Sequence, residues 1–138
     1  IIGVFLGGLY SMRKGVIESL LVGAVIAAFS NLLFAWLAVS DINITFLIVV
    51  ITADNIASGF AGAAFVVYLS SLTSIKFTAT QYALFSSMML FVPKLIAGYA
   101  GGIVDLIGYS QFFIFTAVLG LPVLVLIYRI KKQSQIKP

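Results

Sequence analysis

Long apolar runs alternate with short polar stretches along this chain, and the pattern predicts one short and four full membrane segments. A helix needs about 20 apolar residues to cross the hydrocarbon core of a bilayer. The expected segments are a stub at 1–9 and spans at 16–39, 44–72, 79–104 and 112–128, the last being the shortest full span. Residues 129–138 form a polar tail. We expect 1–138 to be part of a transmembrane domain, with no soluble domain attached within it.

The apolar runs are continuous and do not alternate with polar residues every second position. Strands of a membrane barrel would alternate. In lipid, every backbone polar group must find a partner inside the segment, which leaves the helix. The predicted fold class is therefore all-α transmembrane, with the end of one helix followed by four full transmembrane helices.

Basic residues fall on one side of this predicted topology. Four successive crossings bring the loop around Arg13, the loop around Lys76 and the tail to the same side, and these regions contain seven of the eight basic residues. The intervening loops carry Asp41 and Asp105 and no basic residue. Because Lys and Arg are enriched in cytoplasmic loops, we expect the C-terminus in the cytoplasm.

Composition supports a membrane protein. Of the 138 residues, 62% are hydrophobic and 9% charged, against roughly 25% charged in soluble domains, and the mean hydropathy is +1.21. The chain has no Cys and no His, so disulfides, thiolate metal sites and imidazole chemistry are excluded. No basic patch with interleaved aromatics indicates nucleic acid, and no cofactor is expected. The first residue is Ile, and we expect a fragment of a longer protein.

Two charged residues lie inside predicted spans. Asp54 and Lys94 are each about nine residues from the outer end of their spans, roughly 13–14 Å deep at about 1.5 Å rise per residue. Intramembrane charges are costly and are usually paired or face water. One interpretation is a substrate or proton site near the midplane, and the other is an ion pair or hydrogen-bonded group that holds helices together.

Small residues surround Asp54. Ser58 and Gly62 follow at intervals of four, and Gly59 and Ala63 repeat that spacing. Such small-xxx-small spacings let helices approach closely. Packing alone explains the pattern, while a thin helix face beside a polar group would also leave room for a ligand. No nucleophile elbow, phosphate-binding loop or catalytic carboxylate pair is present, so an enzyme is not expected.

The segment "GGLYSMRKG" resembles the cytoplasmic signature of the major facilitator superfamily, of the form G-G-x-x-x-D-R-x-G. Gly7, Gly8, Arg13 and Gly15 match, and Met12 stands at the acidic position. The second-half copy of that motif lies between helices 8 and 9 of a twelve-helix transporter. Four spans and a basic tail then follow, as they do here.

Two further stretches resemble helices 10 and 11 of the AmpG-type muropeptide permeases in this superfamily. The first combines Asp54 and Asn55 with a Gly/Ala-rich run ending in A-A-F-V. The second is "TATQYALFSS", with Thr78, Thr80, Gln81 and Tyr82 as motif residues. The family's basic residue in helix 11 is Arg, and this chain has Lys94 there, without the bidentate fork of Arg. The resemblance covers nearly the whole chain and less than half of a complete permease.

The resemblance implies proton-driven import of anhydromuropeptides across the bacterial inner membrane during cell-wall recycling. Asp54, Asn55 and Ser58 would then face the central cavity, and Lys94 would partner Asp54 or a substrate carboxylate. The partners would be membrane lipid, protons, a muropeptide and the missing N-terminal half of the transporter. The alternatives are a facilitator for another solute, such as a peptide, sugar or drug, and a non-transporting relic of such a gene.

Overall fold

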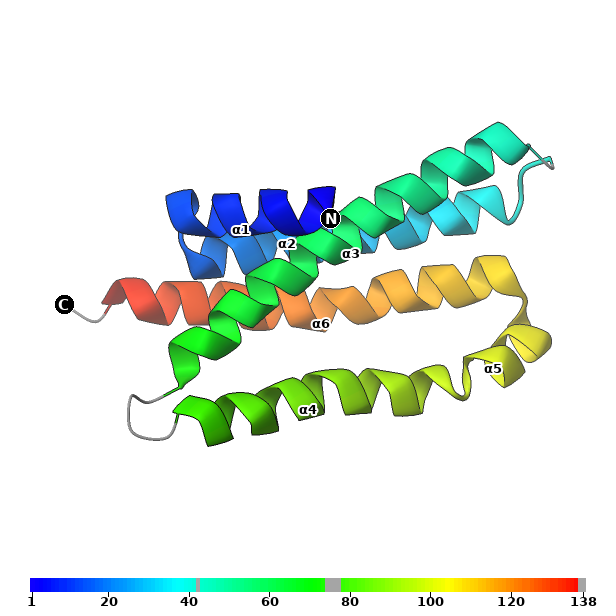
Figure 1. Ribbon diagram of the computed structural model, residues 1–138. Helices are drawn as coiled ribbons and strands as arrows, with labels where there is room; N and C mark the ends of the chain where they lie inside the picture. The colour runs from blue at the N-terminus through cyan, green and yellow to red at the C-terminus, as the bar shows by residue number, and fades with distance from the viewer. Residues whose placement is uncertain (42, 74–77, 137–138) are drawn as a thin grey trace.

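The computed structural model describes residues 1–41, 43–73 and 78–136, and these residues form six helices without a strand. Thr78 and residues 134–136 are described by their backbone alone. The helices, coloured along the chain in Figure 1, are α1 (Ile2–Lys14), α2 (Val16–Leu37), α3 (Ile44–Leu72), α4 (Thr78–Ala97), α5 (Ala100–Ile107) and α6 (Tyr109–Ile136). The predicted all-helical fold class is confirmed.

Four stretches of helix are long and apolar enough to cross a membrane. They are Val16–Leu37, Ile44–Leu72, Ala79–Ile107 and Tyr109–Gln133. Most of their large apolar side chains are exposed on the outside of the helix bundle, where a bilayer would cover them at no cost in hydration. The structure is therefore that of a transmembrane helix bundle.

The helices differ in extent from the apolar runs that predicted them. α1 continues to Lys14, past the expected stub end at residue 9, and α6 begins at Tyr109 and continues to Ile136 through most of the expected tail. Hydropathy marks the apolar part of a helix, whereas its polar ends keep the same backbone hydrogen bonds. The expected span 79–104 is interrupted between Ala97 and Ala100 by a turn at Gly98 and Tyr99.

Glycines and a cap set the breaks between helices. Gly15 (φ 90°, ψ 162°) separates α1 from α2, and Gly108 (φ 80°, ψ 161°) separates α5 from α6. This region of backbone space is open to almost no other residue. Asn43 begins α3 by accepting a hydrogen bond from the Phe46 N–H, which satisfies one of the free amides of the first turn.

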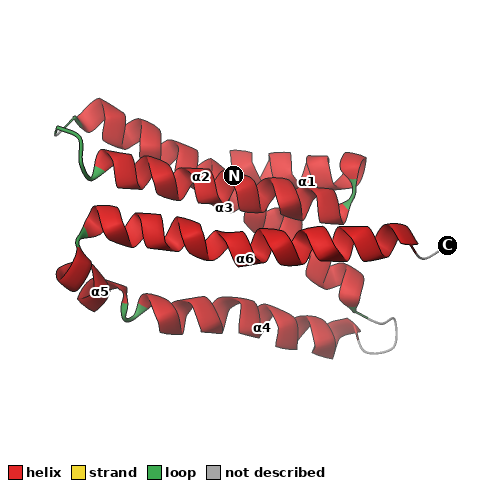
Figure 2. Cartoon of the chain, turned by 180° about the vertical axis from the view of Figure 1, so that it is seen from behind, coloured by secondary structure: helices red, strands yellow, loops and turns green. Residues whose placement is uncertain are grey.

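α2 is the centre of the bundle. It packs against α3 on one side and α6 on the other, and α1 packs against α3. α4 runs alongside α6 in Figures 1 and 2 but makes its close backbone contacts with α3 and α5. The buried residues of α1 are all small, namely Gly3, Gly7 and Ser11, so α1 can lie close to α3. The fold is thus a tight group of α1, α2, α3 and α6 with α4 beside it.

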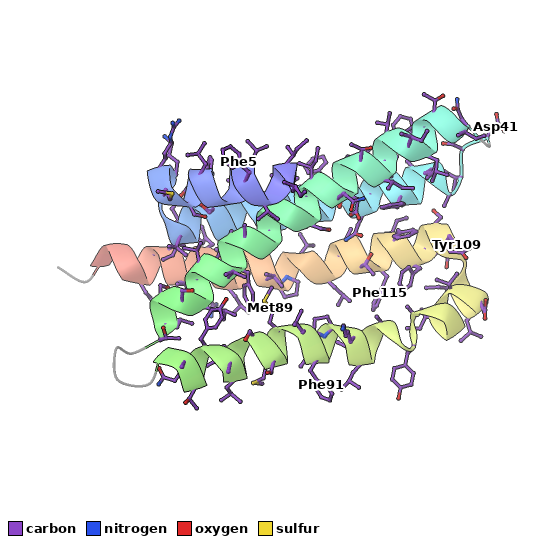
Figure 3. The ribbon with its side chains drawn as sticks, in the orientation of Figure 1. Phe5, Asp41, Met89, Phe91, Tyr109 and Phe115 are labelled. Carbon is purple, nitrogen blue, oxygen red and sulfur yellow. The ribbon has the colours of Figure 1, made fainter. Side chains whose placement is uncertain are left out.

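One end of the bundle is basic. Arg13 and Lys14 end α1, and Arg129, Lys131 and Lys132 lie in the last part of α6 at the same end (Figure 1). Asp41 and Tyr109 mark the opposite end (Figure 3). Lys76 and Lys137, which were assigned to the basic side from sequence, lie outside the described residues.

Candidate functional site

Asp54 is held by a serine of the neighbouring helix. Ser30 of α2 is only 4% exposed, and its Oγ lies 2.9 Å from Oδ1 of Asp54 on α3. The same Oγ lies 2.9 Å from the backbone carbonyl oxygen of Ala27. Asp54 is half-buried. The intramembrane carboxylate therefore has a hydrogen-bonding partner within the α2–α3 contact.

This arrangement can satisfy Asp54 in both of its protonation states. A serine hydroxyl has one hydrogen to donate and two lone pairs that accept. When the carboxylate is ionised, Ser30 donates to Asp54. When the carboxyl is protonated, Asp54 donates to Ser30 and Ser30 turns its own hydrogen toward Ala27. The contact between the two side chains can thus be kept whether or not Asp54 carries a proton.

Asn55 and Ser58, the two neighbours singled out from sequence, are exposed. The Asn55 Nδ2 donates to the Ile51 carbonyl one turn earlier at 2.8 Å, so this amide is tied to its own helix. Ser58 lies one turn after Asp54 on the same side of α3. Both side chains present polar atoms outside the α2–α3 contact.

Lys94 is exposed on α4 and comes directly after Pro93, in the last turn of the helix. Across the described parts of the chain, no ion pair joins Lys94 to Asp54, and the ion pair that is present links Lys131 to Glu18. The pairing of Asp54 with Lys94 that the matched depths suggested is not formed here. The hydroxyl of Ser30 serves as the partner of Asp54 instead.

The two small-residue spacings around Asp54 have different roles. A Cβ added at Gly59 would lie 3.0 Å from the Val4 backbone nitrogen of α1, so Gly59 serves close packing. A Cβ added at Gly62 would meet nothing within 4 Å, because Gly62 borders a cavity. Close packing therefore accounts for Gly59, and Gly62 lies beside open space. That this space holds a ligand stays a prediction.

The glycines that match the major facilitator signature also differ in role, some packing closely and others facing open space. A Cβ at Gly7 would lie 2.6 Å from the Phe60 carbonyl oxygen, whereas one at Gly8 would meet nothing within 4 Å. Gly15 forms the break between α1 and α2, and Arg13 is exposed. The match to the family signature thus includes one packing glycine and one glycine required by the backbone.

The second motif opens α4. Thr78 is the first helical residue, and its side chain lies outside the described part of the chain. Thr80 is exposed, while Gln81 and Tyr82 are half-buried. The Tyr82 carbonyl accepts a hydrogen bond of 2.6 Å from the Ser86 hydroxyl. The motif therefore lies at the basic end of the bundle (Figure 1).

An apolar cavity of about 610 Å³, not foreseen from sequence, lies between α2, α3, α4 and α6. Its lining includes Leu20, Gly62, Met89, Pro93 and Leu126. Met89 lies on the side of α4 that faces the other helices, and Phe91 points away from them (Figure 3). A smaller polar pocket of about 420 Å³ adjoins the basic end and is lined in part by Lys14, Glu18, Ser71 and Lys131.

Ser30 was also missed from sequence, although a signal was present. It lies about nine residues from the outer end of the expected span 16–39, which is the same depth as Asp54. A hydroxyl at matched depth on an adjacent antiparallel span is a candidate partner. Among the described residues, no cluster of three or more acidic, Cys or His side chains gathers in a way that would hold a metal ion.

Along nearly its whole length, the chain is similar to rickettsial proteins that carry a transporter name. It is 36% identical to "Putative transporter AmpG 1" of Rickettsia bellii over 135 residues, which are 98% of this chain and 33% of the relative. It is 31% identical to "Putative transporter AmpG 4" of Rickettsia felis over 136 residues, or 99% of this chain and 33% of the relative. It is 34% identical to "Putative transporter AmpG 1" of Rickettsia prowazekii over 131 residues, which are 95% of this chain and 30% of the relative.

The chain thus spans about a third of the length of the curated relatives it matches. No family model matches the chain, and no solved structure matches it significantly. The chain is therefore related to the AmpG-type transporters over nearly all of its length, which confirms the family resemblance predicted from its motifs.

Proposed function

We propose that this chain forms part of a proton-coupled importer of anhydromuropeptides in the bacterial inner membrane, with its basic end in the cytoplasm. The observation that carries the proposal is the similarity to AmpG-named transporters over 98% of the chain. The substrate, the coupling ion and a first half supplied by the rest of the transporter follow from the family resemblance. The basic residues at one end support the orientation.

In this proposal Asp54 carries the coupled proton. Support comes from the Ser30 hydroxyl at 2.9 Å, which can partner the ionised and the protonated carboxyl alike. An intramembrane carboxylate is by default a candidate for a proton relay. Asn55 and Ser58 offer exposed polar atoms to a sugar or peptide, and the Lys94 ammonium offers a charge to a substrate carboxylate.

The experiment uses the complete transporter in proteoliposomes with a labelled anhydromuropeptide. An imposed proton gradient should drive accumulation, and unlabelled anhydromuropeptide should compete far better than a dipeptide, a monosaccharide or a cationic drug. Accumulation of one of those other solutes in place of the muropeptide would assign the protein to a different substrate. If the complete protein inserts into the membrane but takes up none of these solutes, the alternative of a non-transporting relic is favoured.

The variant Asp54→Asn distinguishes a role of Asp54 in proton coupling from a role in substrate binding. It should abolish gradient-driven accumulation while preserving exchange of labelled for unlabelled substrate at equal concentration, because exchange needs no net proton movement. Loss of both activities in a correctly inserted protein would instead assign Asp54 to substrate binding. Full gradient-driven uptake by Asp54→Asn would contradict any coupling role. Thr52→Ala is the matched control, because the Thr52 hydroxyl donates to the Ile48 carbonyl of its own helix.

A further inference from the structure

The apolar cavity and the polar pocket adjoin one another. Ile17 and Tyr68 line both of them, so a single elongated molecule can extend from one into the other. We propose that together they bind one anionic phospholipid, with a hydrocarbon tail in the apolar cavity and the phosphate headgroup in the polar pocket. The proposal goes beyond transport and does not depend on which solute is carried.

The lining of the cavity matches a hydrocarbon chain. Among the described residues that line it, Tyr68 supplies the only side-chain hydroxyl, and none is charged or carries an amide. A muropeptide has sugar hydroxyls and carboxylates that would lose their hydration there without gaining partners. An acyl chain gains from each methylene that leaves water or fills empty space. The volume of about 610 Å³ lies within the usual range for small-molecule sites.

The charges of the polar pocket match an anionic headgroup. Lys14 and Lys131 line it together with one carboxylate, Glu18. Lys131 and Glu18 form an ion pair, and Lys14 has no ion pair within the described chain. The pocket thus keeps one uncompensated positive charge at the basic end of the bundle. Basic pockets between transmembrane helices at the cytoplasmic face are known to take the headgroups of anionic lipids.

The headgroup is tested by lipid retention in native mass spectrometry of protein extracted in mild detergent. Phosphatidylglycerol should be retained in preference to phosphatidylcholine with the same acyl chains. Lys14→Gln should weaken phosphatidylglycerol retention about five-fold, the contribution of one lysine near an anionic surface. Lys132→Gln, an exposed lysine that does not line the pocket, should leave it unchanged. Equal retention of the two lipids, or equal effects of the two variants, would overturn the headgroup site.

The tail is tested by filling the cavity. Gly62→Leu places an isobutyl group where a Cβ meets nothing within 4 Å, and it should reduce lipid retention at least about ten-fold, since several buried methylenes are displaced. Gly8→Leu is the matched control, because Gly8 is equally open and lies outside the cavity. If both variants retain the lipid equally, the cavity is not its site.

A measurement on the unaltered protein covers the case in which Gly62→Leu fails to fold. Phosphatidylglycerol with a photoreactive acyl tail is added at one equivalent to delipidated protein, and the crosslinked peptides are sequenced. Adducts should concentrate at cavity residues such as Met89 and Leu126. Adducts that favour Phe91, which is 61% exposed on the outer side of α4, would overturn the proposal and indicate non-specific coating by lipid.

Discussion

A carboxylate can lie within this apolar helix pair because one small hydroxyl lies opposite it. Ser30 brings its Oγ to 2.9 Å from Asp54 while remaining almost wholly buried. The depth of Asp54 could be predicted by counting residues along its span. Its partner could not be assigned, because Ser30 and Lys94 lie at similar depths and only the packing of α2 on α3, with α4 farther away, decides between them.

The contact between Ser30 and Asp54 should be measurable as a coupling energy. In a double-mutant cycle with Ser30→Ala and Asp54→Asn, we expect a coupling energy of about 0.6 kcal/mol or more, since hydrogen bonds between membrane helices average about 0.6 and reach about 1.7 kcal/mol. Reversible unfolding in mixed micelles provides the free energies. A cycle that pairs Asp54→Asn with Ser70→Ala is the control, because the Ser70 hydroxyl bonds to the Val66 carbonyl of its own helix. A Ser30 coupling no larger than that control would show that the hydrogen bond does not contribute to stability.

Glycines determine how closely the helices approach and where they end. Gly3 and Gly7 on α1 face α3 so closely that an added Cβ would lie 2.2 and 2.6 Å from the carbonyl oxygens of Ile56 and Phe60. Small-residue spacing predicted close packing along α3. It did not reveal which glycines pack and which border the cavity, because that depends on how α1 crosses α3 and not on the spacing of small residues along the sequence.

Gly7→Ala should loosen the α1–α3 contact. The added methyl would be 2.6 Å from the Phe60 carbonyl oxygen, so the helices must separate, at a cost of about 1–3 kcal/mol. Gly8→Ala adds the same methyl into open space and should cost nothing, or gain slightly from the better helix propensity of Ala. Thermal unfolding in detergent compares the two variants, and equal stabilities would mean that α1 does not pack on α3 as described.

Gly15→Ala should destabilise the junction of α1 and α2. With φ at 90° and ψ at 162°, the position is open to almost no residue but Gly, and a non-glycine residue there costs about 1–3 kcal/mol. Gly101→Ala, where a Cβ has free space and φ is not positive, serves as the comparison in the same unfolding assay. A Gly15→Ala protein as stable as the Gly101→Ala protein would show that the chain can cross this junction in another conformation.

For the whole molecule, the sequence predicted how many membrane-spanning helices there are but not how they are arranged. Continuous apolar runs predicted four full spans, and the structure has four stretches fit to cross a membrane. The interruption at Gly98 and Tyr99 was not predicted, because the expected span 79–104 runs through it without a polar break. The apolar cavity was not predicted either, since residues of four helices, α2, α3, α4 and α6, line it, and no local pattern encodes how these helices are placed.

The orientation of the molecule in the membrane can be tested with single cysteines, since the chain has none of its own. Met12 and Leu106 are each 86% exposed and lie near opposite ends of the bundle. Two spans lie between them, and Leu106 is next to the last residue of a third, Ala79–Ile107. The chain therefore crosses the membrane three times from Met12 to Leu106, and an odd number of crossings places two residues on opposite sides. Because Met12 lies beside Arg13 and Lys14, the enrichment of basic residues in cytoplasmic regions assigns it to the inside.

An impermeant maleimide added to intact cells should therefore label Leu106→Cys and should reach Met12→Cys only after the membrane is opened. Phe91→Cys, exposed to 61% in the middle of a span, should stay unlabelled in both conditions, since a thiol in hydrocarbon does not ionise readily. Labelling of Met12→Cys in intact cells would reverse the orientation. Labelling of Met12→Cys and Leu106→Cys from the same side would require an even number of crossings between them, and one of the three spans would then not cross the membrane.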